Sequence, residues 1–171
     1  MPGLKIVDAT AHIGCDTCNF AWLYPGAEIT AIEVDPVVHK VLLGNIAQLK
    51  RIISRAVVPP VRVVNADCLE FLKELASPVD LVYFDPPWGP DWHKTRDTPL
   101  HSLNIGGRSL ARVAAETRAT SATTVVVKIP GNLDVNCFIA DVKEVFPAAS
   151  LEVKEVFKPK NGLAYRLVAI Q

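Results

Sequence analysis

The segment Phe84–Trp88, with the sequence Phe-Asp-Pro-Pro-Trp, combines residue types that can do chemistry together. The carboxylate of Asp85 and a neighbouring backbone carbonyl can accept hydrogen bonds from an exocyclic NH2 group. Pro86 and Pro87 hold the carbonyls in place, because their φ angles are fixed and they carry no N–H. Trp88 offers a flat face on which a base can stack. The segment therefore predicts amino-group chemistry on a nucleobase.

A second motif surrounds Asp8, which leaves an apolar run at the start of the chain. The loop after Asp8 turns at Gly14, where the missing side chain lets the backbone approach a ligand closely. A helix is expected to follow, with Asp16 or Thr17 as its cap, and its N-terminus supplies free N–H groups. An ordinary turn between a strand and a helix is the alternative interpretation.

Two further acids, Glu33 and Asp67, end the next two predicted strands. Glu33 can accept hydrogen bonds from both ribose hydroxyls of a nucleoside. Asp67 can accept from an adenine amino group, or it can cap the helix after it, as Asp35 is expected to do for its own helix. The ordered set of Asp8, Glu33 and Asp67 predicts a nucleoside cofactor lying across three strands.

The elements that must position these residues alternate along the chain. Strands are expected at 4–7, 28–34, 61–64, 81–84 and 123–129, and helices at 17–23, 36–54, 69–75, 108–117 and 134–145. Strands at 151–157 and 164–170 form a hairpin around Asn161-Gly162, a strong turn signal. Repeated βα units predict an α/β fold, with a mostly parallel sheet, helices on both faces and a C-terminal antiparallel hairpin. Ligands of such sheets lie at the carboxyl ends of the strands.

Composition limits the classes of function. The 171 residues fit one domain, residues 1–171, and 50% of them are hydrophobic. The 18 basic and 18 acidic side chains cancel, whereas a sequence-independent grip on long nucleic acid usually needs a basic excess. A small or localised substrate is therefore favoured. The sequence has neither a membrane-length apolar run nor a secretory signal. Cys15 and Cys18 form a lone C-x-x-C pair, for which reduced thiols are favoured over zinc, so we expect no metal.

With these motifs, nearly the whole chain resembles class I S-adenosylmethionine-dependent methyltransferases. More narrowly, it is similar to the catalytic core of the trimethylguanosine synthase family, which includes related proteins of large DNA viruses. The resemblance rests on Val7-Asp8-Ala9 through Gly14 and Thr17 with Phe20-Ala21, on Ala31–Pro36, and on Asp85–Pro90. It implies a Rossmann-like fold, S-adenosyl-L-methionine as cofactor, and methylation of the exocyclic N2 of a 7-methylguanosine RNA cap. The partner would be capped RNA or the cap nucleotide, inside a cell, in the nucleus or the cytoplasm.

The resemblance also implies roles for individual residues. Asp8 and Gly14 with its loop would hold the methionine part of the cofactor, Glu33 the ribose and Asp67 the adenine. The full expected cofactor set is Asp8, Ala9, Gly14, Thr17, Glu33, Val34, Asp67 and Cys68.

On the substrate side, Asp85 and Pro86 would orient the target amine, with Pro87 and Trp88 completing the catalytic segment. Trp88 would stack on the positively charged methylguanine. The amine would attack the sulfonium methyl group directly, and Asp85 could stabilise the positive charge that develops on nitrogen.

Three more residues are substrate-binding candidates from their own positions, not from the resemblance. Lys128 and Asn132 stand at the end of the fifth predicted strand, at the same sheet edge, where they could contact a phosphate or base. Trp92 lies in a loop of mixed aromatic and basic character after the motif, which suits a nucleotide with phosphates. A solvated loop is the alternative interpretation for all three.

Two alternatives stay open. The Asp-Pro-Pro-Trp motif also occurs in adenine-N6 methyltransferases of RNA or DNA. A methyltransferase-like binding subunit without turnover is the other alternative, because His12 stands where the family commonly has glycine and the net charge is zero.

Overall fold

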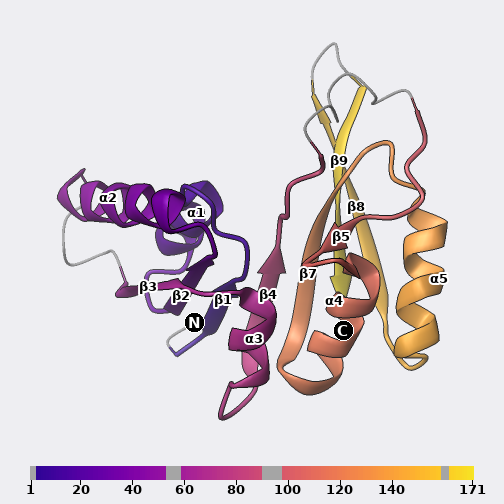
Figure 1. Ribbon diagram of the computed structural model, residues 1–171, viewed down its shortest axis with the longest axis horizontal. Helices are drawn as coiled ribbons and strands as arrows, with labels where there is room; N and C mark the ends of the chain where they lie inside the picture. Colours follow the sequence, from indigo (N-terminus) through magenta and orange to yellow (C-terminus); the bar gives the residue numbers. More distant parts are fainter. Residues whose placement is uncertain (1–2, 53–58, 90–97, 159–161) are drawn as a thin grey trace. The chain divides into compact units, whose positions relative to one another are not determined.

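The computed structural model describes residues 3–52, 59–89, 98–158 and 162–171 (Figure 1). The chain divides into two compact units, Met1–Tyr83 and Phe84–Gln171.

The first unit is built on four parallel strands. These are β1 (Lys5–Asp8), β2 (Glu28–Glu33), β3 (Val61–Asn65) and β4 (Val79–Phe84), in the order β3-β2-β1-β4. Asp8 pairs with Ala31, and Glu33 pairs with Asn65. Because parallel strands end at the same edge, Asp8, Glu33 and Asp67 come to one edge of the sheet, as predicted.

The helices of this unit cover both faces of its strands (Figure 1). Helix α1 (Cys15–Leu23) connects β1 to β2, and helix α2 (Pro36–Ile52) connects β2 to β3, so both connections run in the same direction across the sheet. Helix α3 (Cys68–Lys73) lies between β3 and β4 in the chain, and this connection runs in the opposite direction. Crossover connections between parallel strands are right-handed. Reversal of the direction therefore moves α3 to the opposite face from α1 and α2.

Helix α2 packs on the sheet through one apolar stripe. Leu42 and Ile46 are buried against Ala31 of β2. Val37 and Val41 also recur at helical spacing, but they are 69% and 47% exposed. The helix predicted over 36–54 is thus confirmed, and the stripe that contains Leu42 and Ile46 is its buried face.

The second unit contains an antiparallel ladder of β7 (Ala122–Pro130), β9 (Gly162–Ile170) and β8 (Leu151–Lys158). Strand β9 lies between the other two, so β8 is the edge strand of this ladder. Helices α4 (Leu110–Thr120) and α5 (Val135–Val145) pack against each other, and α4 also packs on β7. The predicted C-terminal antiparallel hairpin is confirmed, as is the α/β class.

A short hairpin of β5 (Asn104–Ile105) and β6 (Arg108–Ser109) was not predicted. Its turn residues Gly106 and Gly107 have φ angles of 56° and 75°, which glycine adopts at low cost. The helix predicted to begin at Arg108 therefore begins two residues later, at Leu110.

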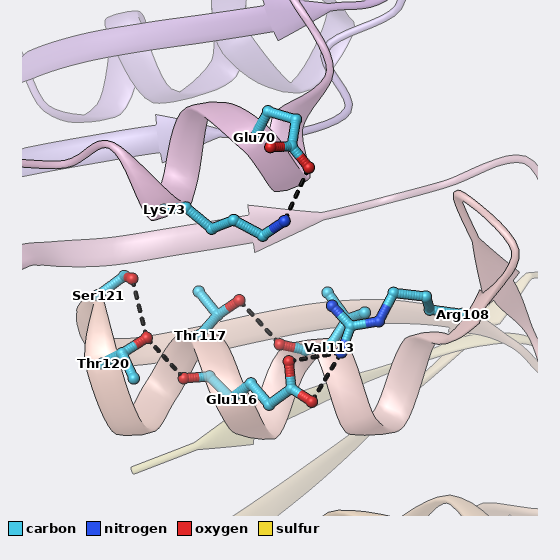
Figure 2. A network of polar contacts seen from close by, with 8 residues as sticks. All are labelled: Glu70, Lys73, Arg108, Val113, Glu116, Thr117, Thr120 and Ser121. Carbon is cyan, nitrogen blue, oxygen red and sulfur yellow. Dashed lines mark hydrogen bonds and ion pairs between the residues drawn. The ribbon is translucent and has the colours of Figure 1, made fainter.

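Polar contacts fix the hairpin to α4, as Figure 2 shows. Arg108 donates to both carboxylate oxygens of Glu116, each at 2.7 Å. Thr117 and Thr120 donate their hydroxyls to backbone carbonyls four residues earlier, so these hydroxyls are satisfied within the helix. The same view shows the Lys73–Glu70 ion pair of α3. Across the described ranges, none of the helices has the length and apolarity needed to cross a membrane.

Candidate active site

The buried end of β1 holds the first predicted site residue. Asp8 is 1% exposed, and Thr17 of α1 is fully buried. The Thr17 hydroxyl donates to Oδ2 of Asp8 at 2.5 Å. Ala9, the next residue, donates its N–H to the carbonyl of Tyr83 at the end of β4. A buried carboxylate is costly unless it is hydrogen-bonded, so these contacts fix the loop where the strand ends.

Gly14 forms the turn into α1. Its φ is 93°, and it is the N-cap of the helix without a side-chain cap bond. The expectation that Asp16 or Thr17 caps this helix was wrong, because Thr17 bonds to Asp8 and Asp16 accepts from the Tyr83 hydroxyl at 3.0 Å. A Cβ atom on Gly14 would lie 2.6 Å from Cδ1 of Leu42. The backbone angle therefore favours glycine, and an added Cβ would also force the buried Leu42 side chain to move.

Glu33 at the end of β2 connects two loops. Its Oε2 accepts from the N–H of His12 at 2.9 Å, and its Oε1 accepts from the N–H of Asp35 at 2.8 Å. His12 has a φ of 49°, a left-handed conformation that is uncommon for residues other than glycine. Each carboxylate oxygen has two lone pairs, so Glu33 retains the capacity to accept from ribose hydroxyls.

The segment after β3 supplies the predicted adenine-side residues. Asp67 caps α3 by accepting from the N–H of Leu69 at 2.7 Å, and Asp35 caps α2 in the same way. Burial, and then the charge of Asp67, raises the pKa of Cys68 to about 12, so Cys68 is a neutral thiol. Val34 is 65% exposed, which leaves an apolar side chain next to Glu33.

In the second unit, Asp85 forms an ion pair with Lys128 of β7. The Nζ of Lys128 lies 2.7 Å from Oδ2 of Asp85, and the side chains are 20% and 25% exposed respectively. The indole N–H of Trp88 donates to the backbone carbonyl of Lys128 at 3.3 Å. Lys128 Nζ also lies 5.1 Å from the ring centroid of Tyr165, a cation–π contact. The structure thus brings together three predicted residues, and Tyr165 is a fourth that sequence reasoning missed.

The loop after β7 contains Asn132, whose side-chain amide donates to the carbonyl of Thr98 at 2.8 Å. Arg166 of β9 donates to the carbonyls of Gly131 and Leu133 at 3.0 and 3.2 Å. Arg166 was not predicted; a basic residue within an otherwise apolar strand was the available signal. Trp92, predicted to bind substrate, lies outside the described residues.

One cluster in the described part of the chain has the composition of a metal site. Ligand atoms of His101, Asp134 and Cys137 all lie within 4.8 Å of one another. Asp134 caps α5 by accepting from the N–H groups of Asn136 and Cys137, at 2.9 and 3.2 Å. The backbone and thiol hydrogen bonds of Cys137 lower the pKa of Asp134. These contacts of Asp134 and Cys137 are those of a helix cap.

The first unit thus brings Asp8, Glu33 and Asp67 to one edge of its strands, with the Gly14 turn at the start of α1. A family model described as "Putative SAM-dependent methyltransferase" matches residues 2–154. The chain belongs to this methyltransferase family. Its cofactor is S-adenosyl-L-methionine. The residues fit that cofactor, because Glu33 offers acceptors for ribose hydroxyls and the exposed Val34 beside it offers apolar surface for the adenine ring.

Among relatives of this methyltransferase, ribosomal RNA small subunit methyltransferase J of Hydrogenovibrio crunogenus (strain DSM 25203 / XCL-2) is 34% identical over 136 residues. The match covers 74% of this chain and 48% of that protein, so the chain spans about half the length of this curated relative.

Two of the solved structures that share the fold illustrate the likeness. Human methyltransferase-like protein 13 in complex with SAH has a TM-score of 0.67 at 18% identity, with 100% of this chain and 72% of that chain covered. An rRNA methylase from Streptococcus thermophilus has a TM-score of 0.59 at 11% identity, with 99% and 86% covered. At such identities the likeness concerns the fold alone, and it confirms the predicted Rossmann-like class I methyltransferase fold.

Proposed function

We propose that this chain is the catalytic part of a methyltransferase that acts on an exocyclic amine of a base in RNA. The observation that carries the proposal is the Asp85–Lys128 pair at 2.7 Å beside Trp88, whose indole N–H is bonded to the Lys128 carbonyl. A base that stacks on an aromatic ring needs a hydrogen-bond acceptor for its amino group beside that ring. Trp88 and Asp85, both fixed by contacts to Lys128, meet these two needs.

In this mechanism each group of the chain has a simple task. When bound, S-adenosyl-L-methionine supplies an electrophilic methyl group. Asp85 accepts a hydrogen bond from the target amine and orients it, because an aromatic amine is a poor nucleophile and positioning can supply much of the rate. The same carboxylate stabilises positive charge that develops on the nitrogen. The product ammonium is acidic enough to lose its proton to water, so Asp85 need not be a strong base.

We take ribosomal RNA as the first substrate to test. The support is the 34% identity to a protein named as a ribosomal RNA small subunit methyltransferase. With that substrate the protein would work in the cytoplasm. The neutral composition fits an enzyme that grips a local RNA structure rather than a long backbone.

The 7-methylguanosine cap is the second candidate, on capped RNA or the free cap nucleotide. Its support is the resemblance of the Asp85–Pro90 segment to the trimethylguanosine synthases, together with Trp88, which could stack on a positively charged base. Adenine-N6 methylation would use the same motif.

Mass spectrometry of nucleosides tests the proposal. The protein is incubated with a deuterated-methyl cofactor and, separately, an unmodified small-subunit rRNA transcript, a 7-methylguanosine cap analogue and an adenine-containing oligonucleotide. We expect label on an exocyclic amine in one of them, with Asp85→Asn as the control that loses it. Label on ribose or on a ring carbon would contradict the proposal. Cofactor binding by calorimetry without transfer to any RNA would favour the binding-subunit alternative.

A further inference from the structure

Lys128 contacts both functional ends of the Asp-Pro-Pro-Trp segment. Its ammonium group lies 2.7 Å from the Asp85 carboxylate, and its backbone carbonyl accepts from the Trp88 indole N–H at 3.3 Å. Asp85 is the proposed amine acceptor, and Trp88 is the proposed stacking surface. One residue therefore links the acceptor and the stacking surface.

We propose that Lys128 is a positioning residue that holds Asp85 in the orientation needed to accept the target amine, with Tyr165 supporting its side chain. The inference rests on the proposed function. It replaces the role expected from the sequence, in which Lys128 contacts a phosphate or base of the substrate.

The backbone of Lys128 is itself well anchored. In the β7–β9 ladder Lys128 pairs with Leu167, and Pro130 pairs with Tyr165. The Tyr165 ring centroid lies 5.1 Å from Lys128 Nζ. The long side chain of lysine has many rotamers, and fixing them costs conformational entropy. Contacts at both the carboxylate and the ring restrict the ammonium group.

The pair has two opposing effects on catalysis. Lys128 fixes the Asp85 carboxylate, which favours the reaction when the geometry is demanding. Its positive charge also offsets part of the negative charge that would stabilise a developing ammonium. If the second effect were larger, removing the ammonium group would raise kcat. We infer that positioning is the larger effect, because the two side chains are mostly shielded from water and have little freedom to reorient together.

Steady-state kinetics of matched variants tests whether removal of the Lys128 ammonium group lowers or raises kcat. Lys128→Met removes the charge at similar length, Lys128→Arg keeps it, and Lys154→Met on exposed β8 is the control. For Lys128→Met we expect kcat to fall by about 10- to 100-fold, with KM for RNA and cofactor within about twofold of wild type. Lys128→Arg should recover most of the lost kcat. Tyr165→Leu removes the ring and should lower kcat less than Lys128→Met does. Tyr165→Phe keeps the ring and should have a kcat close to wild type.

Other outcomes overturn the inference. A higher KM for RNA at unchanged kcat would make Lys128 a substrate contact. A higher kcat, or wild-type kinetics, in Lys128→Met would reject positioning. Wild-type protein that binds cofactor but methylates no RNA would instead count against the proposed function.

A double-mutant cycle in urea unfolding tests the pair without substrate. The variants are Lys128→Met, Asp85→Asn and the combination. Coupling is expected, so that the double variant loses less stability than the two single losses added together. Strict additivity would reject the contact on which the inference depends, whatever the RNA assays give.

Discussion

The backbone N–H of His12 donates to the Glu33 carboxylate at 2.9 Å, which joins the loop after β1 to the end of β2. The other carboxylate oxygen accepts from Asp35 at the start of the next loop. Glu33 is therefore oriented by two backbone groups. Because these bonds fix the carboxylate, little side-chain entropy remains to be lost when a ribose binds. A glycine commonly stands at the His12 position in the resembled family, and His12 keeps the left-handed conformation that a glycine would adopt.

Glu33→Gln should weaken cofactor binding. The amide has only one acceptor oxygen, so it cannot serve both backbone N–H groups and two ribose hydroxyls. We expect the Kd for S-adenosyl-L-methionine, measured by calorimetry, to rise about 10- to 100-fold, which corresponds to the loss of one or two hydrogen bonds to a charged group. Glu152→Gln, on exposed β8, is the matched control and should keep the wild-type Kd. An unchanged Kd in a folded Glu33→Gln protein would remove Glu33 from the site.

Gly14→Ala and Gly44→Ala should change stability in opposite directions. At Gly14 an added Cβ would lie 2.6 Å from Leu42 Cδ1 on a backbone with φ of 93°, and we expect a loss of about 1–3 kcal/mol in the free energy of unfolding. Gly44 lies within α2 with nothing within 4 Å of its Cβ position, so alanine should add about 0.5–1 kcal/mol. Urea denaturation measures both, and a stable Gly14→Ala variant would contradict the packing described here.

The parts of this fold that were predictable from sequence are those set by local pattern. Alternation of apolar strands and helices gave the parallel sheet, and the position of Asp8, Glu33 and Asp67 at strand ends followed from it. The Asp85–Lys128 contact joins residues 43 apart in sequence, and no local pattern marks it. The link between Asp16 and Tyr83 is likewise a consequence of strand order. The sequence allowed two roles for Asp67, a helix cap and a contact to adenine. The structure shows the helix cap, and binding of adenine stays a prediction.

Cys68 should resist alkylation while the protein is folded. Burial and the nearby Asp67 raise its pKa from 9.0 to about 12, so very little thiolate exists near pH 8. Cys15 is exposed and should react first with a thiol reagent, as resolved by peptide mass spectrometry. Cys137 is also exposed, but its hydrogen bond to Asp134 raises its pKa, so it should react more slowly than Cys15.

The pKa shift of Cys68 also has a consequence for stability. The folded state favours the neutral thiol, so this contribution is complete below about pH 9 and is lost as pH rises towards 12. Cys68→Ala should flatten that part of the stability curve, and an equal alkylation rate at all four cysteines would contradict the assigned burial.

Trp88→Ala should weaken RNA binding while leaving cofactor binding intact. Loss of stacking between a base and an aromatic ring costs about 1–3 kcal/mol, or about 5- to 150-fold in Kd. Trp88→Phe keeps a ring but loses the N–H that bonds to the Lys128 carbonyl, so it should retain most of the affinity and lower kcat more than it raises Kd. Trp22→Ala is the matched control, since Trp22 is 61% exposed on α1. Fluorescence anisotropy with labelled RNA gives the Kd values, and calorimetry checks the cofactor. Equal RNA affinity for Trp88→Ala and wild type would end the stacking role of this residue and leave Asp85 as the remaining support for base recognition.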